Sequence, residues 1–330
     1  MAGIVVSLAL LWWTFRDVRV SEVLAHARSA RWSWLILTVV LATLTFPVRL
    51  LRWRLILRDA DGRPLPLGAL WHAVAVGFMA NNLLPARAGE VARAYVASKQ
   101  LENVRFTTAL ASIGVERVFD GLTVVALLTF GLLAPSFPSH ATMGSVPLAR
   151  VVTNLGILFA AALVVALLVV YRPAFWLGIA GRVSRATLPE RAAARILSIL
   201  EGLVGGLTVL RSPARFAGVV VWSFALWLVN GASFWACFVA FGIAVPPEGA
   251  LVMQGVLAFA VAVPSTPGYV GVFEAAIRGT LGIYGVASSL AVGYALTYHI
   301  TTFIPITLLG LWSLSRVGMH IGELRARPTT

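Results

Sequence analysis

Three clusters of ionisable residues interrupt an otherwise apolar chain, and the first lies in the run "NNLLPARAGEVARA". Arg87, Glu90 and Arg93 stand three residues apart there, so on a helix the carboxylate lies between two guanidinium groups on one face. Positive charge is left over, and beside the free amides of a helix N-terminus it suits a phosphate group. The alternative is a cluster at the membrane surface that only fixes topology. The candidate binding and helix-breaking residues here are Asn82, Pro85, Arg87, Gly89, Glu90 and Arg93.

The second cluster, Glu116, Arg117 and Asp120, lies well inside the apolar run "TTALASIGVERVFDGLTVVALLTF". A charge at membrane depth costs at least about 2.5 kcal/mol on insertion scales, so these residues need partners. Arg117 shares a helix face with Asp120 and can neutralise only one of the two acids. We expect the remaining negative charge to pair with Arg87 or Arg93 and the cluster to take part in substrate binding. An internal structural ion network is the alternative.

The third cluster lies beside several helix-breaking residues in "VPSTPGYVGVFEAAIRG". Proline and glycine release backbone groups from the helical ladder, and a hydroxyl group such as that of Thr266 can satisfy some of them or bind a head group. Glu274 precedes Arg278 by four residues, the favourable order for a helical ion pair. A pair that only stabilises a re-entrant turn is the alternative. The candidate residues here are Pro264, Thr266, Pro267, Gly268, Gly271, Glu274 and Arg278.

The elements that must position these clusters are membrane helices, because 59% of the 330 residues are hydrophobic and only 12% are charged. A helix needs about 20 apolar residues to cross a bilayer. Apolar runs predict spans at 32–49, 107–133, 151–171, 216–241 and 286–314, with a shorter helix at 1–15. The regions 67–100 and 250–285 are apolar but broken in the middle. The expected fold is an all-α polytopic membrane protein with about six full spans and two re-entrant regions.

Arginine-rich loops predict the orientation of these helices. The loop after the second helix is expected to contain Arg49, Arg52, Arg54, Arg58 and Arg63. Further arginines lie between residues 172 and 215 and at the C-terminus, whereas 134–149 and 242–249 contain no Lys or Arg. We therefore expect a multi-pass protein of the cytoplasmic membrane with a cytoplasmic C-terminus. Each span moves the chain to the other side of the membrane, and this parity places the 16–31 loop outside. The loop nevertheless carries arginines, and an amphipathic helix lying in the membrane interface would reconcile its charge with its position.

Parity also makes each broken region a re-entrant hairpin or a helix pair, since each must return to the side from which it starts. The order helix, broken pair, helix therefore occurs at 32–133 and again at 216–314, and the copies enter the membrane from opposite sides. In transporters such inverted repeats bring their broken helices together and form the substrate site there. Two unrelated Pro-Gly breaks in ordinary helices are the alternative. The whole chain, 1–330, is expected to be one membrane domain, with an amphipathic helix in a cytoplasmic linker at 172–215.

Other functional classes find little support in the sequence. A net charge of +13 would suit nucleic acid in a soluble protein, but here the basic residues lie between apolar runs, so we expect no nucleic-acid partner. The single cysteine, Cys237, permits no cysteine metal cluster, and the five histidines show no metal-ligand spacing. His72 and His299 fall on apolar helices and are expected to pack rather than catalyse. With no nucleophile motif and no P-loop, we expect neither enzyme activity nor a metal or cofactor.

Three segments together resemble a known family. "NNLLPARAGEVARAY", "ASIGVERVFDGL" and "VPSTPGYVGVFEAAI", in this order and at this spacing, are similar to the lysylphosphatidylglycerol synthase transmembrane-region family, which includes the flippase half of the multiple peptide resistance factors. The resemblance covers residues 30–315. It implies a helical bundle with re-entrant segments that moves a phospholipid or lipid-linked head group across the cytoplasmic membrane. The third motif often reads Pro-Gly-Gly in relatives, whereas here Tyr269 follows Gly268, a departure that concerns head-group size.

We therefore expect a lipid flippase or scramblase whose breaks form a midplane cavity. The residues expected to hold the lipid phosphate are Arg87, Arg93 and Arg117; those expected to balance them and to receive a cationic head group or protons are Glu90, Glu116, Asp120 and Glu274. The expected partners are a phospholipid, which can be aminoacylated, or a polyprenyl-linked lipid, and a separate lipid-modifying enzyme; a homo-oligomer is compatible with the sequence. The alternative is a non-transporting module that recruits a lipid-modifying or glycosyltransferase partner through 172–215. An integral-membrane lipid transferase is a third option, disfavoured by the missing nucleophile and metal site.

Overall fold

The computed structural model is almost entirely helical, and it describes residues 2–59, 62–84, 88–138, 171–206, 212–262 and 265–325, with scattered positions from 142 to 168. Pro85, Arg87 and Pro264 lie outside the described residues, as does most of the expected span at 151–171. The first helices are α1 (Ala2–Phe15), α2 (Val20–Ser29), α3 (Trp32–Ile56), α4 (Leu67–Leu83), α5 (Gly89–Gln100) and α6 (Phe106–Leu133). A two-residue antiparallel ladder follows, formed by β1 (Thr142–Met143) and β2 (Val146–Pro147). The later helices are α8 (Pro173–Thr187), α9 (Glu190–Gly206), α10 (Pro213–Ala240), α11 (Pro247–Ala260), the 3₁₀ turn η2 (Pro267–Tyr269), α12 (Val272–Ile283), α13 (Ser288–Arg316) and α14 (Ile321–Arg325).

Three helices of the described residues, α3, α10 and α13, are long and apolar enough to cross a membrane. Helix α6 has 28 residues, but every 18-residue stretch of it contains the charged cluster that begins at Glu116. The chain is thus a helical membrane protein, and the polytopic arrangement fits it. The number of spans and the re-entrant course of the broken regions stay predictions.

The helix expected at 32–49 is longer than the sequence predicted. Helix α3 continues to Ile56, because the run after Arg49 contains apolar residues that pack inside, including Trp53, which is fully buried. Arg49 and Arg52 are therefore buried helix residues, and their assignment to a cytoplasmic loop was wrong.

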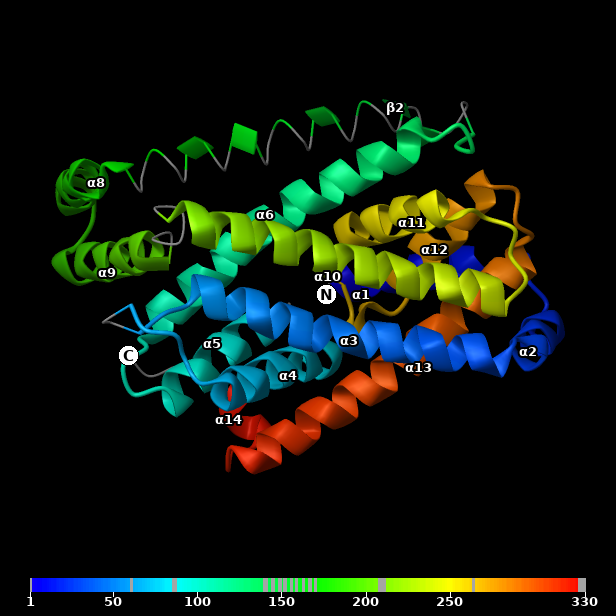
Figure 1. The fold of residues 1–330 in the computed structure, drawn as a ribbon, viewed down its shortest axis with the longest axis horizontal. Helices are drawn as coiled ribbons and strands as arrows, with labels where there is room; N and C mark the ends of the chain where they lie inside the picture. The colour runs from blue at the N-terminus through cyan, green and yellow to red at the C-terminus, as the bar shows by residue number, and fades with distance from the viewer. Residues whose placement is uncertain are drawn as a thin grey trace.

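The two broken regions predicted from the sequence are both present. The first divides into α4 and α5, and the second into α11, η2 and α12. Helices α3 and α10 lie side by side through the centre of the molecule (Figure 1). Helix α4 packs against α13, and α11 packs against α6, so each first half of a broken pair contacts the last helix of the other repeat. This reciprocal packing is the pattern expected of two repeats related by a two-fold axis.

The remaining helices surround this arrangement. Helix α2 forms where an interfacial helix was expected and contacts α13, and α1 packs against α12. In the expected linker, α9 is the predicted amphipathic helix; it packs against α6, and α8 packs against α9 (Figure 1). Residues 207–211, within the expected linker, lie outside the described part of the chain.

Candidate functional site

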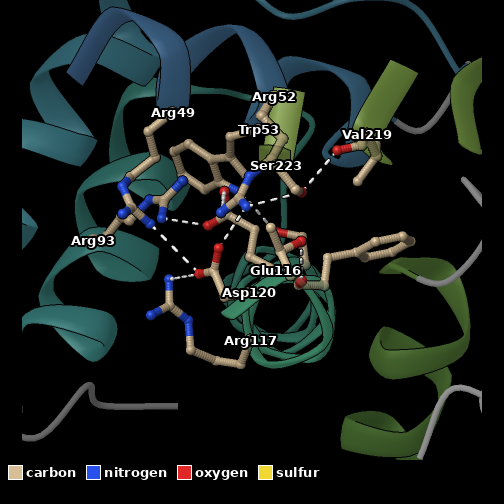
Figure 2. Close-up of polar contacts among 12 residues, drawn as sticks. Arg49, Arg52, Trp53, Arg93, Glu116, Arg117, Asp120, Val219 and Ser223 are labelled. Carbon is tan, nitrogen blue, oxygen red and sulfur yellow. Dashed lines mark hydrogen bonds and ion pairs between the residues drawn. The ribbon is translucent and has the colours of Figure 1, made fainter. Parts of the chain in front are cut away.

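A buried network of arginines and carboxylates joins α3, α5 and α6 (Figure 2). We call it the arginine network; its described members are Arg49, Arg52, Arg93, Arg117, Glu90, Glu116 and Asp120. Its centre is Arg52, whose side chain is fully buried. One terminal nitrogen of Arg52 lies 2.5 Å from Asp120 Oδ1 and donates to Ser223 of α10 at 3.1 Å; the other lies 3.3 Å from Glu116 Oε1.

Residues of the first broken region complete the network. Arg93 of α5 lies 2.5 Å from Glu116 Oε2 and stacks over the ring of Trp53, with 3.7 Å between the guanidinium carbon and the ring centre. The expectation that an acid of α6 pairs with Arg93 is therefore confirmed. Among the described residues, the ion pair of Arg93 is with Glu116, whereas the helical spacing suggested Glu90.

The exposed end of the network lies at Arg117, whose side chain is 38% accessible. Its terminal nitrogen lies 2.9 Å from Asp120 Oδ2, which confirms the pairing that the three-residue spacing predicted. Its Nε lies 3.7 Å from Glu90 of α5, so α6 contacts the first break through this pair as well. The second cluster of the sequence is thus joined to the described part of the first.

Arg49 is the least satisfied cation of the network. Its Nη1 lies 3.7 Å from Asp120 Oδ2, beyond hydrogen-bond distance, and has no hydrogen-bond partner among the described residues. Asp120 is already engaged, since its Oδ1 also accepts a hydrogen bond from Trp227 at 2.9 Å. The guanidinium of Arg49 lies over the ring of Phe78 instead. Counted over its described members, the network has four arginines and three carboxylates, so one positive charge is in excess.

Sequence reasoning missed both Arg49 and Arg52 as site residues. The signal was available, because the two arginines stand three residues apart in "FPVRLLRWRLI" and the residues around them are apolar enough to continue the helix. Three-residue spacing places them on one face, which in the structure is the face that meets Asp120.

The first break is held closely against its neighbours. A Cβ atom on Gly89 would lie 2.0 Å from the carbonyl oxygen of Gly77, so only glycine permits α4 and α5 to approach this closely. Asn81 at the end of α4 accepts a hydrogen bond from the backbone N–H of Gly89. Asn82 points elsewhere and donates to Thr307 of α13 at 2.8 Å. The candidate residue Asn82 therefore fixes α4 to α13.

The second break contacts the end of the first. Helix α4 packs against η2, and the Asn82 carbonyl oxygen lies 3.5 Å from where a Cβ atom of Gly268 would be. Gly268 has a φ of +66° and Tyr269 one of +61°, so the turn has two residues in the left-handed region. The expectation that the two breaks meet is confirmed for the described residues, although the position of this contact relative to a bilayer stays a prediction.

Glu274 closes the start of α12. Its Oε2 accepts a hydrogen bond from the backbone N–H of Gly271 at 2.7 Å, while Oε1 lies 2.5 Å from Nδ1 of His299 on α13. The predicted helical pair between Glu274 and Arg278 is therefore wrong. His299 does pack, since it stacks on Phe273, but it also pairs with a buried carboxylate, which sequence reasoning missed. Within the described residues no hydrogen bond or ion pair joins Glu274 to the arginine network.

Arg278 of α12 binds the end of the N-terminal helix α1 and Asp17 instead of pairing with Glu274. It forms a two-pronged ion pair with Asp17, at 2.6 and 2.7 Å, and donates to the carbonyl oxygens of Trp13 and Thr14 at the end of α1. Thr266 also contacts α1, where its hydroxyl oxygen lies 3.2 Å from that of Ser7. These two candidate binding residues therefore hold α1 against the second break.

Replacing Asp17 by asparagine should lower the thermal unfolding midpoint at neutral pH. The hydrogen bond from Arg278 holds the pKa of Asp17 below its ordinary value of 3.8. A carboxylate with a lowered folded-state pKa stabilises the fold above its unfolded pKa and ceases to do so as the pH falls through the folded value. The difference in midpoint between wild type and D17N should therefore shrink below pH 3.8. An equal difference at neutral and acid pH would contradict this ion pair.

A cavity of about 260 Å³ lies between α3, α10, α11 and α13. Arg49 and Tyr269 both line it, so it extends from the arginine network to the second break. Its polar lining also includes Asn230 and Gln254, and the Nε2 atom of Gln254 has no hydrogen-bond partner among the described residues. Among the residues that the structure describes, no group of three or more His, Cys, Asp or Glu could hold a metal ion.

A buried charged network beside two contacting helix breaks, in a bundle of apolar helices, is the arrangement of a helical membrane protein with broken helices. The family model for the lysylphosphatidylglycerol synthase transmembrane region matches residues 1–310. The chain belongs to this family.

Curated relatives agree with the assignment. A UPF0104 membrane protein of Methanothermobacter thermautotrophicus is 27% identical over 337 aligned positions, which cover 98% of this chain and 94% of the relative. A second UPF0104 membrane protein of the same organism is 26% identical over 84% of this chain and 82% of its own length. Glycosyltransferase AglD of Haloferax volcanii is 29% identical over 84% of this chain, but the match spans only 47% of AglD. No solved structure matches the chain significantly.

Proposed function

We propose that this chain is a lipid flippase or scramblase, which moves the head group of a phospholipid or polyprenyl-linked lipid across the cytoplasmic membrane. The observation that carries the proposal is the arginine network, with its excess of one positive charge beside a cavity at the contact between the two broken regions. A lipid phosphate is the anion that such a site meets in a membrane, and the acyl chains can remain in the bilayer. Membership of a family named for a transmembrane region supports the same function.

In this proposal the protein transports and does not catalyse. The lipid is made or consumed by a separate lipid-modifying enzyme, and the C-terminus lies in the cytoplasm. The roles of the candidate residues differ from those first expected. Arg93 holds Glu116 in place, while Arg49 and the half-exposed Arg117 are the cations nearest to a site that a phosphate can reach.

Reconstitution in liposomes with head-group-labelled phosphatidylglycerol tests the proposal. An impermeant quencher should reach inner-leaflet label faster than in protein-free liposomes. Glu90→Gln should slow this access, because Glu90 lies at the partly exposed end of the network and can be neutralised without burying an unpaired charge. Glu102→Gln, an exposed carboxylate after α5, is the matched control and should behave as wild type. Equal access with and without protein, for phosphatidylglycerol and polyprenyl phosphate alike, would contradict the proposal.

A second candidate function is a non-transporting module that recruits a glycosyltransferase or lipid-modifying partner. One observation favours it: the chain aligns with about half of a protein named as a glycosyltransferase. The helices α8 and α9 would be the recruiting surface, with Phe175 and Trp176 exposed on α8. This candidate predicts that removal of α9 abolishes activity in cells while Glu90→Gln has no effect.

A further inference from the structure

We propose that the cavity between α3, α10, α11 and α13 selects a lipid whose head group carries a phosphate and uncharged hydroxyl groups, and excludes aminoacylated, cationic head groups. This inference rests on the proposed function, because it assumes that the cavity receives a lipid head group. It narrows the substrate class beyond what the family name suggests.

The first argument is the sign of the charge on the cavity wall. Of the described residues that line the cavity, Arg49 is the charged one, and no carboxylate is among them. The carboxylates of the network are turned toward other arginines: Glu116 toward Arg52 and Arg93, and Asp120 chiefly toward Arg52 and Arg117. A cationic head group would therefore meet the guanidinium of Arg49, whose carboxylate partner Asp120 lies 3.7 Å away and is shared with Arg52 and Arg117. Such a contact is unfavourable in a medium of low dielectric constant.

The second argument is the kind of polar atom that is left without a partner. Arg49 Nη1 and Gln254 Nε2 are both buried, both lack a hydrogen-bond partner among the described residues, and both belong to residues that line this cavity. Both atoms are donors, and neither can accept a hydrogen bond. A buried donor without a partner is costly, so the missing group must be an acceptor such as a phosphate oxygen.

The other residues of the cavity wall suit the hydroxyl groups and carbon atoms of a head group rather than a second charged group on it. Gln254 Oε1 accepts from Asn230, and the hydroxyl groups of Thr45 and Thr302 donate to backbone carbonyl groups, which leaves their oxygens able to accept. The aromatic lining residues are Phe46, Phe78, Trp227, Phe234, Tyr269, Phe273 and Tyr298. A volume of about 260 Å³ accommodates a polar head group rather than a whole lipid.

The aromatic residues of the cavity wall also suit a different ligand, a lipid with a choline head group. Aromatic rings can hold a quaternary ammonium group by cation–π contact, so a zwitterionic choline head group must be compared directly. The position of Arg49 argues against it, because its guanidinium lies 4.9 Å from the Phe78 ring centre and already carries a positive charge at that face.

Binding of defined lipids to the purified full-length chain tests the inference. The probes are phosphatidylglycerol, lysyl-phosphatidylglycerol, phosphatidylcholine and the soluble sn-glycerol 1-phosphate, and the readout is the dissociation constant from native mass spectrometry or competition with a fluorescent lipid. Phosphatidylglycerol should bind at least about tenfold more tightly than the lysylated and choline lipids, because its head group brings no cation next to Arg49. Equal or tighter binding of either other lipid would overturn the inference. So would tighter binding of free glycerol phosphate, which would indicate a soluble ligand.

Variants then locate the selectivity. Arg49→Gln should weaken phosphatidylglycerol binding at least about tenfold, and Gln254→Met, which keeps the length but removes the donor, should weaken it about threefold or more. Gln254→Glu should reverse the preference in favour of the lysylated lipid. Arg54→Gln on the same helix is the control, because Arg54 donates to the Leu65 carbonyl group, away from the cavity. If Arg49→Gln does not fold, the two Gln254 variants still test the cavity assignment, because Gln254 lies outside the arginine network and its replacement leaves the ion pairs in place.

The outcome is separable from that of the proposed function. Selective binding without translocation would leave the cavity assignment standing and contradict transport. Translocation with unchanged binding in the Arg49 and Gln254 variants would support transport and overturn the cavity assignment.

Discussion

Replacing Asp120 by asparagine should destabilise the protein by about 3–5 kcal/mol, the usual cost of removing one partner from a buried ion pair. Asp120 is the carboxylate that three arginines share: Arg52 at 2.5 Å, Arg117 at 2.9 Å and Arg49 at 3.7 Å. Asparagine has the same shape but no charge, so the buried Arg52 and Arg49 lose their main counter-ion. The measurement is the thermal unfolding midpoint of purified protein in detergent.

Two comparisons show whether charge is the cause. Glu22→Gln breaks the exposed pair with Arg19, whose members are 46% and 83% accessible, and should change stability by less than about 1 kcal/mol. The double variant Asp120→Asn with Arg49→Gln should recover part of the loss, because it removes one of the uncompensated cations. Loss of stability equal to that of Glu22→Gln would contradict a tightly coupled network.

Gly89→Ala should have the second-largest effect, on both stability and transport. The added Cβ atom would lie 2.0 Å from the Gly77 carbonyl oxygen and 2.5 Å from the Asn81 side chain, so α4 and α5 must separate. Overpacking of this kind costs about 1–3 kcal/mol, occasionally more. Since α5 carries Arg93 to Glu116, movement of α5 should also open the arginine network and slow lipid translocation.

Gly114→Ala is the matched control for this change. Gly114 lies in α6, and a Cβ atom there would meet nothing within 4 Å. Alanine in an exposed helix position should stabilise by about 0.5–1 kcal/mol relative to glycine. If Gly89→Ala unfolded at the same temperature as Gly114→Ala, the close approach of α4 and α5 would be wrong.

Much of the fold follows from sequence because membrane helices have a strong apolar signal. The ends of α6, α10 and α13 lie within a few residues of the expected spans, and both Pro-Gly breaks interrupt helices where predicted. The end of α3 was wrong because arginines were taken as loop markers, although a membrane helix can retain them where carboxylates lie opposite.

Helical spacing predicted pairs within one helix better than pairs between helices. It correctly predicted the pair of Arg117 with Asp120. It wrongly predicted a pair of Glu274 with Arg278. Glu274 pairs instead with His299, 25 positions away, and Arg278 with Asp17, 261 positions away. Local geometry allows the helical pair, and tertiary packing decides against it. The cavity could not be foreseen, because its lining comes from α3, α4, α10, α11, η2, α12 and α13 together.

The central claim is that a lipid phosphate passes the arginine network at Arg49. The most direct measurement is the initial rate at which an impermeant quencher reaches labelled phosphatidylglycerol in liposomes containing Arg49→Gln, with Arg49→Lys and Arg54→Gln prepared at the same protein density. We predict that Arg49→Gln lowers the protein-dependent rate at least about tenfold, that Arg49→Lys retains part of it, and that Arg54→Gln matches wild type. A folded Arg49→Gln protein, with a wild-type unfolding midpoint, that moves the lipid at the wild-type rate would contradict the claim.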